Sequence, residues 1–151
     1  AGKVLSALGA PVEDLRSVNV GPVWLVGEVR TARALALISP DMGALAAATT
    51  AANAGGVTLF AASGEKSSAI HVRSFAPAHG INEDPVCGSG NISVAAHLRF
   101  FGKLSSFGPS YVARQGMQLG RDGRVSVRVG TNGIEIGGKC VTCVEGSLQV
   151  T

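Results

Sequence analysis

Reactive side chains and glycines are concentrated in one stretch of the chain, residues 75–91. This stretch contains the carboxylate of Asp84 and the thiol of Cys87, and its turn Gly88-Ser89-Gly90 leads directly into an apolar segment. If that segment is a helix, its first turn presents unsatisfied N–H groups at the positive end of the helix dipole. Glycine lets a ligand approach the backbone closely. The pattern therefore predicts a site for a small anion, either a carboxylate or a phosphate.

The Gly-Ser-Gly turn could also be a simple helix cap, whereas nucleotide binding is disfavoured. A Gly-Ser-Gly turn before a helix also occurs as a simple helix cap, and this alternative stays open at the level of sequence. Nucleotide binding is disfavoured, because Ser93 stands where the dinucleotide fingerprint needs its third glycine. The lysine of a phosphate-binding P-loop is also missing from the turn.

The surrounding sequence predicts several strands and two main helices that would position this turn. One helix is expected from Met42 to Ala54 and the other from Gly90 to Phe101, where apolar residues recur at helical spacing. Short turns separate most of the strands, which indicates antiparallel pairing and an α+β fold class. The expected strands are 18–29 in two pieces, 57–62, 69–75, 111–118, 125–129, 133–136 and 139–144.

Bulk properties limit the classes of function. The 151 residues predict one domain, 1–151, of which 46% are hydrophobic and only 15% charged. No apolar run approaches the roughly 20 residues of a membrane-spanning helix, so no membrane association is expected. The charge of +3 is scattered and aromatic residues make up 5%, so nucleic-acid binding is not expected. Three cysteines without a signal peptide argue against a secreted, disulfide-bonded domain, and a cytoplasmic location is expected.

Two blocks of sequence carry a resemblance to a known family. The first runs from Phe75-Ala76-Pro77 to Glu83-Asp84-Pro85-Val86-Cys87-Gly88-Ser89-Gly90, and the second comprises Gln115-Gly116, Gly120-Arg121, Gly137-Gly138 and Gly146-Ser147-Leu148. Together they resemble the PhzF-like (phenazine-biosynthesis) family, whose fold is that of diaminopimelate epimerase. The resemblance spans nearly all of this chain but about half of the family's usual length, and corresponds to the carboxyl-terminal half. It implies a single diaminopimelate epimerase-like half, with a curved, mostly antiparallel sheet or barrel around a central helix.

The resemblance implies isomerase or epimerase chemistry on a small carboxylate, by proton transfer without a metal or other cofactor. Asp84 matches the aspartate that contacts substrate, and Ser89 matches the serine at the helix start. A role of Asp84 as a loop-capping carboxylate stays open. The N–H groups of Gly88, Ser89 and Gly90 would hold the substrate carboxylate, and Asn91 completes the expected substrate-binding set. The family's proton-transferring glutamate and its G-H-P histidine belong to the absent half. His79 is therefore not assigned that histidine's role.

Cys87 departs from the isomerases of this family, which usually have threonine there, and matches the cysteine of the related epimerases and racemases. A thiol at a helix amino terminus has a lowered pKa, which would make Cys87 reactive and a member of the catalytic set with Asp84. Free cysteine is also among the residues most often buried, so a structural role for Cys87 stays open. Racemases of this type use two cysteines on opposite faces of the substrate, and this region supplies one.

Three hypotheses follow for the chain as a whole. It is an isomerase completed by a missing amino-terminal half, a homodimeric enzyme with Cys87 facing Cys87, or a non-catalytic anion-binding or assembly module. The first two predict that the chain is not a monomer, because apolar surface of the missing contact would otherwise be bare.

The remaining polar residues are mostly expected to have structural roles. Cys140 and Cys143 lie three apart in a predicted strand, so their thiols should point to opposite faces and form neither a disulfide nor a metal site. His71 and His97 are expected to be structural. For Arg121, substrate binding and a turn-fixing role both stay open.

Overall fold

The computed structural model describes residues 1–150 and has an α+β fold. Its helices are α1 (Gly2–Leu8), α2 (Ala32–Ala36), α3 (Met42–Ala51) and α4 (Gly88–Phe100), with short 3-10 turns at η1 (Pro77–His79), η2 (Leu104–Ser106) and η3 (Met117–Leu119). Its strands are β1 (Glu13–Asn19), β2 (Val23–Glu28), β3 (Gly56–Glu65), β4 (Ser68–Ala76), β5 (Ile81–Asp84), β6 (Ser110–Gln115), β7 (Gly123–Val129) and β8 (Ile134–Gly137). Within residues 1–150, every helix is too short or too polar to cross a membrane.

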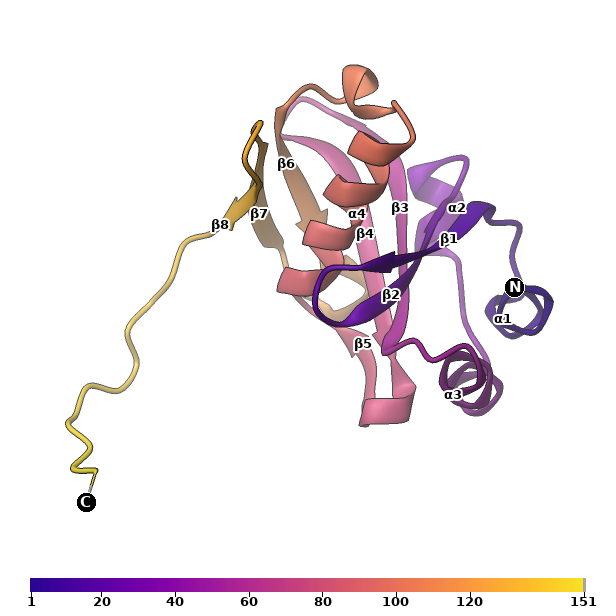
Figure 1. Cartoon of the computed structure of the whole chain (residues 1–151), viewed down its shortest axis with the longest axis horizontal. Coiled ribbons are helices and arrows are strands. Elements are labelled where there is room, and N and C mark those ends of the chain that lie inside the picture. The colour runs from indigo at the N-terminus through magenta and orange to yellow at the C-terminus, as the bar shows by residue number, and fades with distance from the viewer. Residues whose placement is uncertain (151) are drawn as a thin grey trace.

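All of these strands belong to one sheet that curls around α4 (Figure 1). The strand order is β1-β2-β3-β4-β6-β7-β8, and β5 pairs with β4 beside this path. The pairs β2–β3 and β4–β6 are parallel and the others are antiparallel. Helix α4 contacts β1 and β2 at one end of the sheet and β7 and β8 at the other. The structure thus confirms the predicted curved, mostly antiparallel sheet around a central helix.

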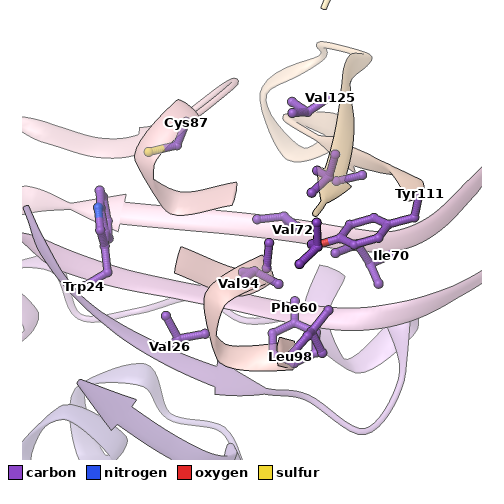
Figure 2. Close-up of a cluster of buried hydrophobic side chains, with 14 of the residues drawn as sticks. Trp24, Val26, Phe60, Ile70, Val72, Cys87, Val94, Leu98, Tyr111 and Val125 are labelled. Carbon is purple, nitrogen blue, oxygen red and sulfur yellow. The ribbon is translucent and has the colours of Figure 1, made fainter. Parts of the chain in front are cut away.

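Alternation along the strands divides the apolar residues between two cores. The inner core lies between the sheet and α4 and includes Phe60, Val72 and Val94 (Figure 2). The outer core lies between the sheet and helices α1, α2 and α3, and includes Leu45 and Leu59. Because successive side chains of a strand point to opposite faces, Leu59 and Phe60 of β3 enter different cores. Both faces of the central strands are consequently buried.

The predicted strand over residues 139–144 is wrong. Residues 138–150 follow β8 without regular structure and extend away from the body of the molecule (Figure 1). Val141, Val144, Leu148 and Val150 on this segment are each more than 80% exposed. Strand formation depends on packing and pairing with a neighbour, and within residues 1–150 no strand pairs with this segment.

His97 on α4 predicts a pH dependence of stability. Its ring is fully buried between Phe60 and Phe101, and neither ring nitrogen has a partner among residues 1–150. Burial lowers the pKa of His97, so the folded state takes up its proton only at a lower pH than the unfolded chain does. The free energy of unfolding should therefore decrease as the pH falls below about 6.5, the ordinary histidine pKa.

Urea unfolding from pH 8 to pH 5 measures this effect. A His97→Phe variant should lose the decrease below pH 6.5, whereas His79→Gln, at an exposed position, should retain it. Parallel pH profiles for the wild type and His97→Phe would contradict the assignment to His97.

Candidate functional site

The segment that contains Asp84 and Cys87 connects β5 to α4. Helix α4 begins at Gly88, and Cys87 is its N-cap, with Sγ accepting a hydrogen bond from the Gly90 N–H at 3.3 Å. The carbonyl of Cys87 accepts the first intrahelical bond from the Asn91 N–H at 3.1 Å. The cap is therefore the cysteine itself, and the Gly-Ser-Gly turn is the first turn of the helix.

Gln115, at the end of β6, joins the two blocks of sequence that define the site. Its Nε2 donates to the Asp84 carbonyl at 2.7 Å, and its Oε1 accepts from the Cys87 N–H at 3.2 Å and from Asn91 Nδ2 at 2.8 Å. The Gln115 side chain is fully buried, so these bonds are shielded from water. Gln115, from the second block of family resemblance, thus fixes the loop between β5 and α4, which belongs to the first block.

Gln115 had no predicted role of its own, although the sequence contains a signal for one. Tyr111 and Ala113 alternate into the inner core along β6, and Gln115 is the next residue on that face. A polar side chain at an inward position of a buried strand requires buried hydrogen-bond partners.

Glycines in both blocks allow the backbones to meet. Gly116 has φ +89°, and a Cβ there would lie 2.6 Å from the Pro85 carbonyl oxygen. A Cβ on Gly90 would lie 2.7 Å from Ser74 Oγ and 2.9 Å from Thr58 Oγ1. Glycine at position 116 lets the turn after β6 pack against Pro85 in the loop before α4. Glycine at position 90 lets the first turn of α4 pack against β3 and β4.

Among residues 1–150, two amides of the first turn stay available for a ligand. The Gly90 N–H is directed to Cys87 Sγ, and the Cys87 N–H is directed to Gln115, whereas Gly88 and Ser89 are too near the helix start to have intrahelical acceptors. The expected cradle of three amides is thereby reduced to the N–H groups of Gly88 and Ser89. Asn91 is only 1% exposed and donates to the Cys87 carbonyl as well as to Gln115, so it lies beneath the turn as part of its scaffold.

An open groove of about 830 Å³ borders this first turn. Apolar side chains of Val86, Val125 and Ile136 line it beside the backbone of Gly88. Asp122, Arg124 and Lys139 add charged side chains to the groove, which continues to the start of the extended carboxyl-terminal segment. The groove can therefore accept a small molecule that joins an anionic group to an apolar body.

Asp84 and Ser89 are each fixed by a hydrogen bond. The half-buried Asp84 accepts the Val86 N–H at Oδ1, over 2.9 Å, and so closes the loop ahead of α4. Ser89 accepts the indole N–H of Trp24 at 3.0 Å. Substrate contact by either residue stays a prediction.

The predicted lowering of the pKa of Cys87 is wrong. Burial of the thiol, which is only 5% exposed, raises its pKa, and the negative charge of Asp84 acts in the same direction. The hydrogen bonds from the Gly90 amide and from Ser89 and Ser74 act in the opposite direction, but burial has the largest effect. At neutral pH Cys87 is therefore a thiol, suited to donating a proton rather than to accepting one.

Because Cys87 is buried and protonated at neutral pH, we expect it to be alkylated slowly. Iodoacetamide at pH 7 should modify the exposed Cys140 and Cys143 quickly and the buried, protonated Cys87 at least tenfold more slowly. Mass spectrometry of peptides from timed samples measures all three rates in one reaction, with Cys140 and Cys143 as internal controls. Equal or faster labelling of Cys87 would contradict the raised pKa.

Glu83, next to Asp84, is held by a buried ion pair that the sequence did not reveal. Its carboxylate accepts two bonds from Arg73, at 2.9 Å from Nε and 2.8 Å from Nη2. The third nitrogen of Arg73 donates to the carbonyls of Leu35 and Ile38 at the end of α2, at 3.0 and 2.6 Å. Arg73 thus links β5 to the outer helical layer and fixes the strand that leads to Asp84.

Of the remaining candidates, Cys140 lines the groove beside the first turn of α4, whereas Arg121, His71 and Cys143 do not line it. Arg121 is exposed, and its backbone N–H closes the turn on the Gly116 carbonyl at 2.9 Å, so both roles of its side chain stay predictions. His71 bonds to Glu65 at 3.1 Å, in agreement with a structural role. Cys140 and Cys143 are both free and exposed.

Comparison with known proteins identifies relatives for nearly the whole chain. The model of a family described as phenazine biosynthesis-like protein, PhzC-PhzF, matches residues 10–146. Antisense-enhancing sequence 1 of Schizosaccharomyces pombe is 32% identical over 95% of this chain and 51% of its own length. An uncharacterized isomerase of Clostridium acetobutylicum is 33% identical over 84% of this chain and 45% of its own length.

Solved structures show the same fold. A phenazine biosynthesis protein of the PhzF family from Enterococcus faecalis superimposes with a TM-score of 0.69 at 28% identity, over 91% of this chain and 47% of that chain. A predicted epimerase from Pseudomonas aeruginosa gives a TM-score of 0.67 at 28% identity, over 91% of this chain and 49% of that chain. The chain thus spans about half the length of these relatives. The expected assignment to the carboxyl-terminal half is not borne out by these matches, which give the covered share and not its position.

Proposed function

Because the chain belongs to the phenazine biosynthesis-like PhzC-PhzF family, we propose that it forms one half of an isomerase or epimerase that transfers a proton on a small carboxylate without a cofactor. The relative from Clostridium acetobutylicum is named an isomerase, and the structural neighbour from Pseudomonas aeruginosa a predicted epimerase. The observation that supports the proposal most strongly is the first turn of α4, where Gly88 lines a mostly apolar groove and the Ser89 amide is the next one along the helix.

In this proposal the substrate carboxylate binds the Gly88 and Ser89 N–H groups at the positive end of the α4 dipole. The apolar body of the substrate lies along Val86, Val125 and Ile136 in the groove. Asp84 borders the same turn and orients the substrate, while its own position is fixed by the loop and by Gln115.

Proton transfer requires an acid and a base within hydrogen-bonding distance of the reacting carbon. Cys87 supplies a neutral thiol and is therefore the acid of this half, whereas the base comes from the second half. A homodimer with two facing Cys87 residues is disfavoured, because one of the two would have to act as a thiolate against its raised pKa. We accordingly expect the active enzyme to contain a second, different half.

Solvent deuterium exchange at the α-carbon of a panel of amino and hydroxy acids tests this proposal. The chain alone is expected to give no exchange. The chain combined with the part of the Enterococcus faecalis protein that it does not match should restore exchange. Asp84→Asn should abolish the restored activity, whereas Glu13→Gln, at an exposed position of β1 outside the groove, should preserve it.

Two results would count against the proposal. Exchange by the chain alone that disappears in Cys87→Ser would indicate the homodimeric enzyme instead. A stable complex of the two halves that binds carboxylates and yet exchanges nothing would indicate a non-catalytic binding module.

A further inference from the structure

Trp24, the single tryptophan of the chain, lies at the start of β2 and reaches the first turn of α4. Its indole N–H donates to Ser89 Oγ at 3.0 Å and so joins residues 65 positions apart. We infer that Trp24 is a positioning residue, which fixes the Ser89 hydroxyl as a hydrogen-bond donor toward the bound anion. The inference rests on the proposed function in one respect, namely that this turn holds the carboxylate of the substrate.

The direction of the Trp24–Ser89 bond determines what Ser89 offers a ligand. An indole nitrogen only donates, so Ser89 Oγ accepts this bond and its own proton must point elsewhere. The other side-chain neighbour of the hydroxyl is Cys87 Sγ at 3.8 Å, and sulfur is a weak acceptor. A carboxylate oxygen beside the Gly88 and Ser89 amides is a much stronger acceptor for that proton. The turn then presents three donors, two from the backbone and one from Ser89.

The indole ring is held too tightly to turn away from Ser89. Trp24 pairs with Gly56 across β2 and β3, and a Cβ on Gly56 would lie 2.6 Å from Trp24 Cζ3. The side chain is only 6% exposed and packs in the inner core, at the same end of the cluster as Cys87 (Figure 2). Glycine at position 56 therefore lets the ring lie against β3, and close packing fixes its N–H direction.

Removing only the indole donor tests the inference. Trp24 is replaced by 3-benzothienylalanine, in which sulfur takes the place of the N–H, and Ser89→Ala and the double variant are prepared beside it. Sulfate is the probe, and its dissociation constant is read from the amide shifts of Gly88 and Ser89 in ¹⁵N NMR spectra. Each single change is expected to weaken sulfate binding roughly tenfold, as for a lost bond to a charged acceptor. The double variant should bind no more weakly than Ser89→Ala alone.

Matched variants separate this role from a general effect on packing. Trp24→Phe should reproduce the weakening, and Ser105→Ala, at an exposed serine of η2 outside the groove, should bind sulfate as the wild type does. Wild-type affinity in the benzothienyl variant would overturn the inference, and so would a weakening of equal size in the Ser89→Ala background. Absence of sulfate-induced shifts at Gly88 and Ser89 in the wild type would overturn the anion site itself and the inference with it.

Discussion

Replacing Gln115 with leucine is expected to destabilise the protein by about 3–5 kcal/mol and to abolish anion binding at the first turn of α4. At this fully buried position the leucine would remove the partner of the Asp84 carbonyl, of the Cys87 N–H and of one of the two bonds that Asn91 Nδ2 makes. Each buried polar group left unsatisfied costs about 1–3 kcal/mol, and the three costs overlap because they share one loop. Urea unfolding measures the loss of stability, and a sulfate titration followed by NMR measures the loss of the site.

Gln118 provides the matched control for this change. It lies on η3, three residues further along, and is exposed, so Gln118→Leu should alter stability by less than about 0.5 kcal/mol. It should also leave anion binding unchanged. If Gln115→Leu had the same stability and the same sulfate affinity as Gln118→Leu, Gln115 would not be what fixes the loop before α4.

The second large effect is expected from Glu83→Ala, which should cost about 3–5 kcal/mol of stability. The Arg73 and Glu83 side chains are 6% and 7% exposed, so the substitution would leave the guanidinium charge buried without its carboxylate. The bonds from Arg73 to the Leu35 and Ile38 carbonyls would remain, but they do not neutralise the charge. Thermal and urea unfolding give the change in the free energy of unfolding.

An exposed ion pair on the same sheet serves as the control. Arg128 and Glu135 pair across β7 and β8 with side chains that are about two-thirds exposed, so Glu135→Ala should cost less than about 1 kcal/mol. Similar losses for the two alanine variants would contradict a structural role for the Arg73–Glu83 pair.

Much of the fold is predictable because its signals are local. Apolar residues at helical spacing after Gly90 indicated the central helix, and the structure confirms it from Gly88 to Phe100. The β-rich run 57–62 and the alternation along residues 69–75 indicated strands, which the structure shows as parts of β3 and β4. The curvature of the sheet was predicted from the family resemblance, since strand patterns alone do not give the order of strands.

The errors and omissions concern contacts between residues distant in sequence. The position of Cys87 at a helix terminus predicted a lowered pKa, whereas the depth at which β3 and β4 bury the thiol reverses the direction. The Trp24–Ser89 bond joins residues 65 positions apart and leaves no trace in local spacing, and the Arg73–Glu83 bond depends on how β4 pairs with β5. The segment 139–144 has a strand-like sequence, but β-structure requires a neighbouring strand, which this segment lacks within residues 1–150.

The most direct test of the central claim, that the first turn of α4 binds a carboxylate, is a benzoate titration followed by ¹⁵N amide shifts. Benzoate joins a carboxylate to an apolar ring and so matches both the amides and the groove beside them. We predict saturable shifts at Gly88 and Ser89, together with shifts at Val86, Val125 and Ile136, and no such shifts in Gln115→Leu. Unchanged Gly88 and Ser89 resonances in the wild type, with benzoate shifts confined to another surface such as the one between α1 and α3, would contradict the claim.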